Sequence, residues 1–281
     1  MSLSPLRPLD TRAMFRPVSS ALVTLLRVLT PEDFDLPTVA GTWTVRDVLA
    51  HLVDLTLRRV SFHRDRMVPP PPPFPITGEQ DFVKFINWLN HEWVDTTRRL
   101  SPRVLTELFD LASDDLATFL EALPIDAPAL FGVSWAGEQI SEGWFDIGRE
   151  FTELWHHQMQ IRLAVDAPPL NGPRYLRAVL EISIRGLPHA YRDVPAKVGD
   201  TVAIEVNGNS GGVWTLRKDP DRWTLWAGAA GNASTVVRMS DEDAWRLLFN
   251  ALPASLAPAA LRIEGRAELA APLLQARSVI V

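Results

Sequence analysis

Two residues of types that bind metal ions stand four positions apart in the stretch Glu150–Ile161. If this stretch is helical, the side chains of Glu153 and His157 project from the same face on adjacent turns. A carboxylate oxygen and an imidazole nitrogen so placed span two ligand positions on one divalent ion. Gln160 and Ile161 continue this face, and a polar pair beside an apolar stripe is costly to bury unless a partner satisfies it. The pair is therefore a candidate for metal binding, and a surface ion pair is the common alternative for this spacing.

His51 is the candidate for a third ligand. It stands between Val48 and Leu55, which are three and four positions away, so it lies on or beside the buried face of a second helix. Helical bundles build metal sites from inward side chains on facing helices. Two histidines and one carboxylate leave a coordination position open, which is typical of catalytic sites. The alternative for His51 alone is a core histidine whose hydrogen bonds the protein satisfies.

Another histidine competes for the ligand position on the fourth helix. His156 follows Glu153 by three residues, and three-residue spacing also places two side chains on one face. We prefer His157 as the ligand, because its four-residue spacing keeps it with Ile161 on the inner face.

The predicted elements divide the chain into two parts. Apolar residues at spacings of three and four predict helices over 18–29, 44–67, 79–100 with a continuation to 123, and 141–165. Four such helices suggest an up-and-down bundle. After residues 166–169 a helix over 173–190 precedes short β-like runs at 201–206, 213–217, 223–226 and 234–239. A helix ending at 249, a last strand at 260–263 and a last helix at 266–277 follow. We expect residues 1–167 to form a four-helix bundle and residues 168–281 a smaller α+β domain with a mostly antiparallel sheet.

Composition excludes several classes of protein. The 281 residues carry a net charge of -6 and are 47% hydrophobic, so the chain can bury a core but lacks the basic surface of a nucleic-acid binder. There are no cysteines, which excludes disulfides, iron–sulfur clusters and a cysteine nucleophile, so any thiol must come from outside. No apolar run reaches the roughly 18–20 residues of a membrane span. The N-terminus also lacks the apolar core of a signal peptide, and we expect a cytoplasmic protein that binds neither membrane nor nucleic acid.

The run Gly41–Leu52 resembles the second-helix motif of the DinB-like superfamily, and most closely the N-terminal domain of mycothiol-dependent maleylpyruvate isomerases. Those proteins carry a tryptophan, a Thr-Val-Arg-Asp stretch and a metal-binding histidine in this order, and Trp43, residues 44–47 and His51 match it. The spacing of Glu153 and His157 resembles the same branch, which often has aspartate where Gln160 stands here. The resemblance covers roughly residues 10–165. It implies that His51, Glu153 and His157 hold a divalent ion, with zinc or nickel as the candidates.

The second half resembles the C-terminal domain attached to these isomerases, which is related to the sterol-carrier fold. The similar runs are residues 238–248 and 261–270. The isomerases use an arginine of this domain near the active site, but a Gly-Arg pair often found after the penultimate helix is replaced here by residues 249–251. Arg246, Arg262 and Arg266 are the candidate substitutes, and for each of them a solvated helix or strand arginine is the favoured alternative.

The resemblance implies a function for the open coordination position. A low-molecular-weight thiol, mycothiol or bacillithiol, would occupy it as cosubstrate, and its thiolate would attack an electrophilic small molecule. Addition to a conjugated double bond, rotation and expulsion would isomerise the substrate, whereas displacement of a leaving group would make the protein an S-transferase.

Two alternatives remain at this stage. One is a metal-dependent hydrolase, in which water takes the open position. The other is a metal-stabilised bundle without chemistry, whose C-terminal domain binds a small apolar ligand among its tryptophans, Trp214, Trp223, Trp226 and Trp245.

Overall fold

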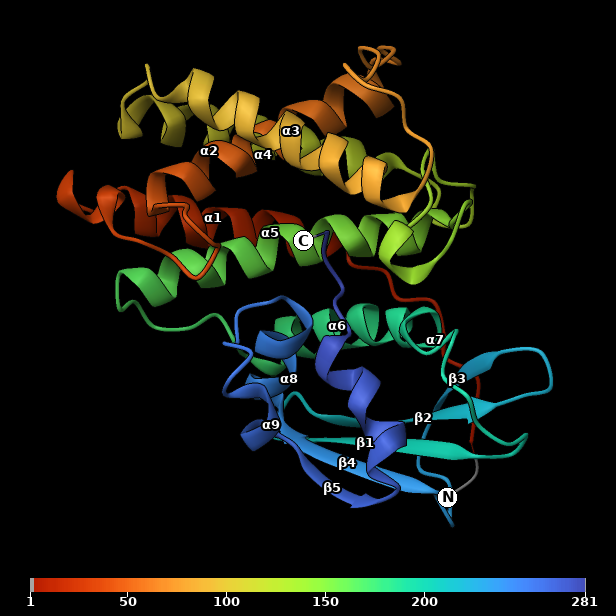
Figure 1. Cartoon of the computed structure of the whole chain (residues 1–281). Coiled ribbons are helices and arrows are strands. Elements are labelled where there is room, and N and C mark those ends of the chain that lie inside the picture. Colours follow the sequence, from red (N-terminus) through yellow and green to blue (C-terminus); the bar gives the residue numbers. More distant parts are fainter. Residues whose placement is uncertain (1–2, 281) are drawn as a thin grey trace.

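The first half of the chain is a group of five long helices (Figure 1). The structure is a computed structural model and describes residues 3–280. The helices are α1 (Phe15–Leu26), α2 (Val45–Arg59), α3 (Glu79–Thr97), α4 (Pro102–Ala122) and α5 (Gly143–Ala164). Helices α1, α2, α4 and α5 pack around a shared core, and α3 packs chiefly against α2 on the outside. The predicted bundle is therefore confirmed, with α3 as an additional flanking helix.

Local sequence signals explain where α2 begins and ends. Thr44 and Asp47 form a capping box, in which the Asp47 backbone amide donates to Thr44 Oγ1 at 3.3 Å and the Thr44 amide donates to the Asp47 carboxylate at 3.1 Å. The helix ends at Arg59 and continues as one π-helical turn, Val60–Arg64, whereas the periodicity predicts helix to residue 67. It stops earlier because Arg66 takes a positive φ of 58° and five prolines follow from residue 69, and proline has no amide hydrogen to donate.

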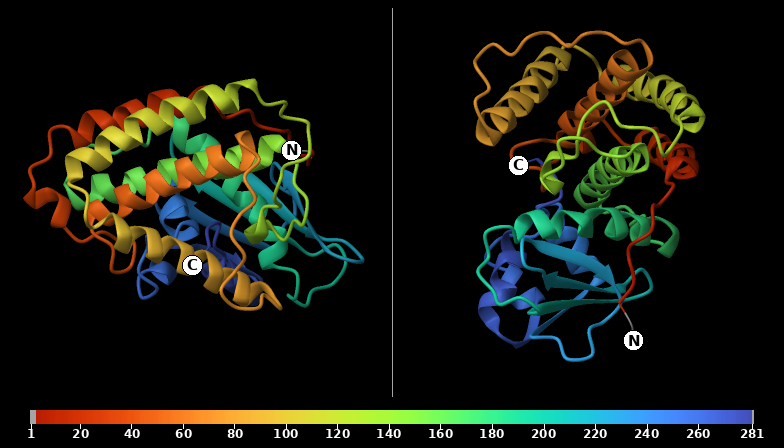
Figure 2. Two further views of the ribbon diagram at one scale, coloured as in Figure 1. Left: turned by 90° about the horizontal axis from the view of Figure 1, so that it is seen from above. Right: turned by 90° about the vertical axis from the view of Figure 1, so that its right-hand side faces the viewer.

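The second half is a five-stranded sheet covered by helices. The strands are β1 (Thr201–Asn207), β2 (Gly212–Lys218), β3 (Trp223–Ala227), β4 (Thr235–Ser240) and β5 (Arg262–Gly265), in the order β3-β2-β1-β4-β5. The β1–β4 pair is parallel and the other three pairs are antiparallel. Figure 2 shows α6 (Pro173–Ser183) between the sheet and the helices of the first half. This confirms the predicted fold class of a helical bundle followed by an α+β part with a mostly antiparallel sheet.

Two predicted element boundaries in the second half are wrong. The helix expected over 173–190 begins and ends where predicted, but a 3-10 turn (Ile184–Gly186) separates α6 from the short α7 (Leu187–Ala190). The helix expected over 266–277 is only α10 (Ala267–Ala270) followed by a 3-10 stretch that contains Pro272. The last strand, expected at 260–263, begins two residues later, because the short α9 (Ala257–Ala260) precedes it.

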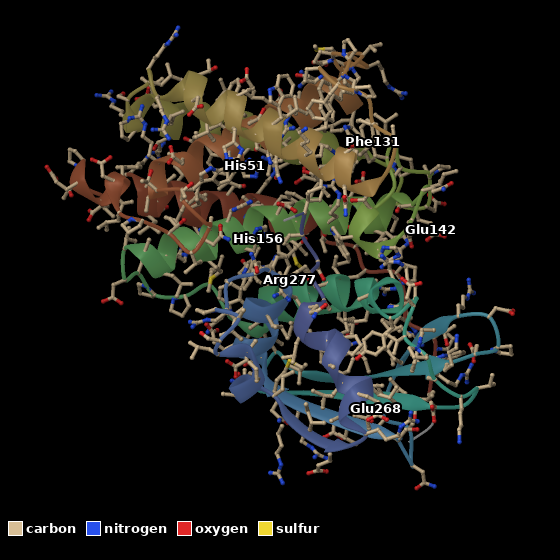
Figure 3. All side chains as sticks on the ribbon, viewed as in Figure 1. His51, Phe131, Glu142, His156, Glu268 and Arg277 are labelled. Atoms are coloured by element: carbon tan, nitrogen blue, oxygen red, sulfur yellow. The ribbon has the colours of Figure 1, made fainter. Side chains whose placement is uncertain are left out.

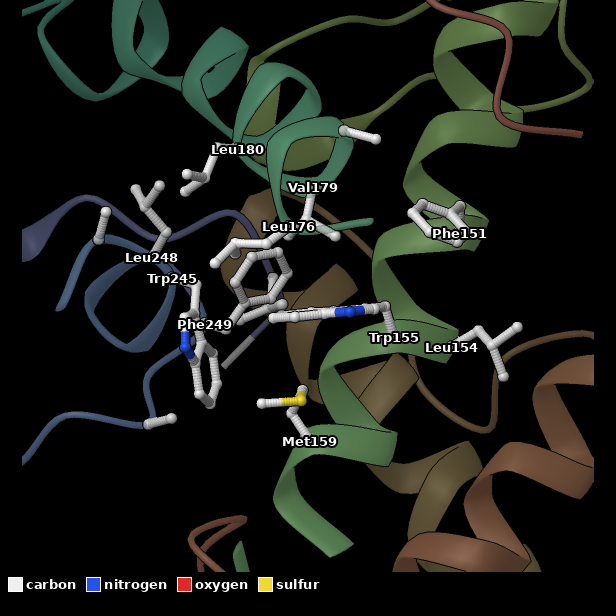
Figure 4. Packing of buried hydrophobic residues seen from close by; sticks show 14 of the residues in the cluster. Phe151, Leu154, Trp155, Met159, Leu176, Val179, Leu180, Trp245, Leu248 and Phe249 are labelled. Carbon is white, nitrogen blue, oxygen red and sulfur yellow. The ribbon is translucent and has the colours of Figure 1, made fainter. Parts of the chain in front are cut away.

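One hydrophobic core runs through both halves. In Figure 4, Trp155 and Met159 of α5 point toward Trp245 of α8 (Asp241–Leu248) and toward Phe249, and the two tryptophan rings meet edge to face at 5.4 Å. At the other end of the molecule, Ser4 pairs through its backbone with Ala227 of β3. The division into domains at residue 167 stays a prediction, and the outermost residues of the predicted domains, 1–2 and 281, lie outside the described chain.

A membrane span was not expected from the sequence. Within residues 3–280, none of the helices combines the length and the apolar character that crossing a bilayer requires.

Candidate metal centre

Helix α2 carries His51 into the interior of the first half. The apolar residues Val45, Val48, Leu49 and Leu52 are all buried, and His51 beside them is only 4% exposed. The ring of Trp43, from the loop before α2, lies over His51 at 4.9 Å between the ring centroids. Figure 3 labels His51 in the first half of the chain, above His156 of α5 in this view. The His51 imidazole is therefore buried beside the apolar residues of α2 and packs against the Trp43 indole ring.

Helix α5 supplies the other two predicted ligands. Glu153 and His157 stack on adjacent turns, with 3.5 Å between Glu153 Oε2 and His157 Nε2. The rings of His51 and His157 meet nearly at right angles, 4.7 Å apart. One side-chain nitrogen of each histidine and one carboxylate oxygen of Glu153 all lie within 4.8 Å of one another. The structure thus brings together the three residues that the sequence selects, from two facing helices.

The hydrogen bonds of the cluster leave ligand atoms available. His157 Nδ1 donates to Gln160 Oε1 at 2.7 Å, which places the proton on Nδ1 and leaves the lone pair of Nε2 toward Glu153. His51 Nδ1 is buried and has no hydrogen-bond partner among the described residues. A buried polar atom without a partner is destabilising, and a metal ion would satisfy it.

Charge states in the cluster suit metal binding. Burial lowers the pKa of His51 well below its usual value, and the charge of Arg58 acts in the same direction, whereas the carboxylate of Glu153 opposes the shift. Burial alone would raise the pKa of Glu153, but its contact with His157 and the positive charge of Arg149 outweigh this effect and lower the pKa to about 2. At neutral pH the cluster therefore offers a neutral His51 imidazole and an ionised carboxylate, the forms that bind a metal. The residues present fit a divalent ion.

His156 has partners outside this cluster, although its ring lies 4.0 Å from the ring of His157. Its Nδ1 donates to the Thr152 carbonyl at 2.8 Å, and its ring stacks on Phe249 of the second half at 4.8 Å. Burial lowers the pKa of His156 to about 3. Of the two adjacent histidines, His157 joins the His51 side and His156 belongs to the packing between the halves.

The three candidate arginines of the second half have other partners. Arg246 pairs with Glu242 at 2.8 Å, and Arg262 pairs with Glu264 at 3.3 Å. Arg266 pairs with both Asp200 and Glu268. Each of these guanidinium groups is engaged with a carboxylate of its own half, and the structure gives none of them a contact with the cluster.

Next to the cluster lies a buried ionic group that the sequence reasoning missed. Arg59 of α2 binds Asp146 of α5 at 2.5 Å, and Arg149 contacts both Asp146 at 3.0 Å and Glu150 at 2.5 Å. Arg149 precedes Glu153 by four residues, which is the sequence signal that could have identified it. The pair of Arg59 with Asp146 joins α2 to α5, and Arg149 stands one turn before the predicted ligand Glu153.

Solved structures share the two-part architecture. The crystal structure of the mycothiol-dependent maleylpyruvate isomerase matches with a TM-score of 0.52 over 84% of this chain and 86% of that chain, at 14% sequence identity. The structure of a histidine-to-alanine mutant of that isomerase matches with the same TM-score and coverage, at 13% identity. At such identities the likeness shows the fold.

The fold and the position of the cluster define a DinB-like helical bundle with an appended α+β half. The family model of the mycothiol maleylpyruvate isomerase N-terminal domain matches residues 15–162, which is more than half of the chain. The protein therefore belongs to this family, as its motifs predict. No curated protein sequence matches the chain significantly.

Proposed function

We propose that this protein is a divalent-metal-binding isomerase that uses a low-molecular-weight thiol as cosubstrate. Membership of the maleylpyruvate isomerase family supports a thiol-dependent isomerase. The observation that carries the metal is the convergence of His51, Glu153 and His157 within 4.8 Å, with His51 Nδ1 left unpartnered. Metal identity belongs to the proposal, and zinc or nickel suits these ligand types.

The chain's own residues would prepare the site for this chemistry. His51, Glu153 and His157 would hold the ion and leave a position for the thiol, and Gln160 would keep His157 Nε2 free to bind. Trp43 covers His51 and reduces its contact with water. A bound divalent ion stabilises a thiolate over the thiol, so it raises the concentration of the nucleophile at neutral pH.

The electrophile would be a small molecule with a conjugated double bond. Reversible addition of the thiol allows rotation about the former double bond, and expulsion of the same thiol regenerates it, so the net reaction is an isomerisation. Mycothiol is the thiol that the family name suggests, and bacillithiol is the second candidate. An S-transferase would use the same centre with a substrate that carries a leaving group.

The two other readings have less support. Hydrolysis would need only water at the open position, and the family does not favour it. Binding of an apolar ligand in the second half would need a cavity there. The apolar cavity among Leu180, Trp214, Met239 and their neighbours has a volume of about 10 Å³, which is too small for any molecule larger than water.

Elemental analysis tests the metal. The purified full chain should contain about one equivalent of divalent metal, and His51→Ala should remove it while His91→Ala, at an exposed histidine of α3, should retain it. Fully folded protein without metal, even after incubation with zinc and nickel salts, would overturn the proposal.

Cobalt substitution tests the thiol. Mycothiol or bacillithiol at millimolar concentration should change the visible d–d absorption of the cobalt form, because sulfur would enter the coordination sphere. An unchanged spectrum with intact cobalt binding would favour a hydrolase over a thiol-dependent isomerase.

A further inference from the structure

A second polar cluster lies beside the metal centre, on the side of α2 that faces α3. Asp54 and Arg58 follow His51 by three and seven residues, so all three side chains project from one side of α2. Arg58 lies two turns along α2 from His51, so the guanidinium is on the side of the helix that bears the metal centre. Asn90 of α3 completes the cluster from the opposite helix.

Contacts within the cluster join the two helices. Arg58 Nη2 donates to Asn90 Oδ1 at 2.8 Å and lies 2.9 Å from Asp54 Oδ2. Asp54 is only 5% exposed, whereas the Arg58 side chain keeps 20% of its surface exposed. The cluster therefore has a buried end at Asp54 and an end that a molecule from solvent can reach at Arg58.

Two atoms of the cluster are incompletely satisfied. In the described part of the chain, Arg58 Nε is buried without a hydrogen-bond partner, and Asp54 Oδ2 accepts no hydrogen bond of normal geometry besides its ionic contact with Arg58. Burial raises the pKa of Asp54 to about 6 even though the charge of Arg58 opposes the shift. A buried donor and a buried acceptor that both lack a full partner destabilise the free protein. A ligand that supplies both kinds of group would relieve this cost.

We propose that Asp54, Arg58 and Asn90 form a subsite that binds the hydroxyl or amide groups of the thiol cosubstrate. Such groups can accept from the guanidinium and donate to the carboxylate at the same time. A neutral polar group suits the cluster, because the charges of Asp54 and Arg58 already oppose each other and a carboxylate ligand would meet Asp54. The inference rests on the proposed function, since the sulfur of the thiol would be held at the neighbouring metal centre.

The test compares two thiols on the cobalt-substituted full chain. 1-Thio-β-glucose carries several hydroxyl groups and ethanethiol carries none, and the absorption of cobalt reports the binding of each. The unsubstituted protein should bind thioglucose more tightly than ethanethiol. Arg58→Met should weaken thioglucose binding by about tenfold or more and leave ethanethiol binding unchanged. Only the thioglucose complex loses a charge-assisted hydrogen bond to the guanidinium. Asp54→Asn should also reduce the preference of the protein for thioglucose over ethanethiol.

Arg46→Met is the matched control. Arg46 also lies on α2 and also ties α3 to it, through the carbonyls of Thr97 at 3.3 Å and Arg98 at 2.7 Å. This variant should keep the preference for thioglucose. An equal loss in Arg46→Met, or an equal weakening of both thiols in Arg58→Met, would overturn the subsite while the proposed function stands. If neither thiol changes the cobalt spectrum of the unsubstituted protein, the proposed function fails and the subsite with it.

Discussion

At the scale of single residues, each predicted ligand has a neighbour of a different kind, and the neighbours of His157 and His51 also orient these two rings. Gln160 accepts from His157, Trp43 lies against His51, and the charge of Arg149 is among the causes that keep Glu153 ionised. Such neighbours restrict the rotation of a ligand before a metal arrives, so less entropy is lost on binding. The geometry of the centre therefore depends on residues that would not themselves touch the metal.

Gln160 provides a direct test of this dependence. Gln160→Leu should lower the metal affinity by about 10–100-fold, because His157 loses the acceptor that directs its Nε2 toward the cluster. Competition with a chromophoric chelator measures the change. Gln80→Leu, at an exposed position of α3, should leave the affinity unaltered. Equal affinities in the two variants would show that this hydrogen bond does not orient the ligand.

His63 makes stability depend on pH. Burial and then the charge of Arg59 lower its pKa to about 4, and His63 Nε2 must accept from Arg59 Nη1, 2.8 Å away. Between about pH 6.5 and 4 the unfolded chain binds a proton that the folded chain does not, so the free energy of unfolding falls as the pH falls. One such group contributes a slope of at most about 1.4 kcal/mol per pH unit.

The variant His63→Gln should therefore have a shallower pH dependence in this window and the same stability trend above pH 6.5. Urea denaturation at several pH values measures this dependence of the free energy of unfolding on pH. His91→Gln serves as the comparison and should keep the full slope, since His91 is exposed. An unchanged slope in His63→Gln would contradict the assigned pKa.

At the scale of elements, the register between α2 and α5 decides whether His51 meets Glu153 and His157. The buried ion pair of Arg59 with Asp146 joins these helices, and Arg149 contacts Asp146 from within α5. Oppositely charged groups at fixed positions on two helices disfavour other registers, because a shifted register would leave a charge buried without its partner. The ionic group is thus well placed to align the helices that carry the centre.

Removal of Asp146 should show this role. Asp146→Ala leaves Arg59 buried without its closest carboxylate and should lower the free energy of unfolding by about 3–5 kcal/mol. The exposed pair of Arg103 and Glu107 is the control, and Glu107→Ala should cost less than about 1 kcal/mol. Urea denaturation measures both. A loss in Asp146→Ala no larger than in the control would argue that the ionic group is dispensable.

At the scale of the whole molecule, the two halves share one core. Trp155 of α5 packs against Trp245 of α8, and the Trp155 Nε1 proton is donated to the Leu170 carbonyl at 2.8 Å. Because α5 carries both Glu153 and His157, the second half supports the helix that bears the centre. We therefore expect the halves to unfold together.

Hydrogen exchange can test this coupling. Trp245→Ala should destabilise the protein by about 3–5 kcal/mol and should reduce the protection of amides in α5 as well as in α8, since a cavity would open between them. Trp88→Ala, at a partly exposed tryptophan of α3, should leave α5 protected. Loss of protection confined to the second half would show that the halves are independent.

The kinds of elements and the identity of the cluster could be predicted from the sequence. The signals are local: a capping pair at Thr44 and Asp47, apolar spacings of three and four, and the four-residue spacing of Glu153 and His157. Such local patterns predict helices and the faces of helices, and the folded chain retains them. Even so, the ends of α2 and of the last helix were misplaced, because Arg66 and Pro272 terminate helices in ways that periodicity does not register.

Only the tertiary structure decided which side chains of different helices contact one another. Periodicity along α5 favours His157 over His156 for the inner face, but it cannot show that His157 meets His51 or that His156 meets Phe249. Nor can it show that Arg59 reaches Asp146, 87 residues later. Spacing within a helix specifies which side chains share a face, but the partner of that face is chosen by packing between distant segments.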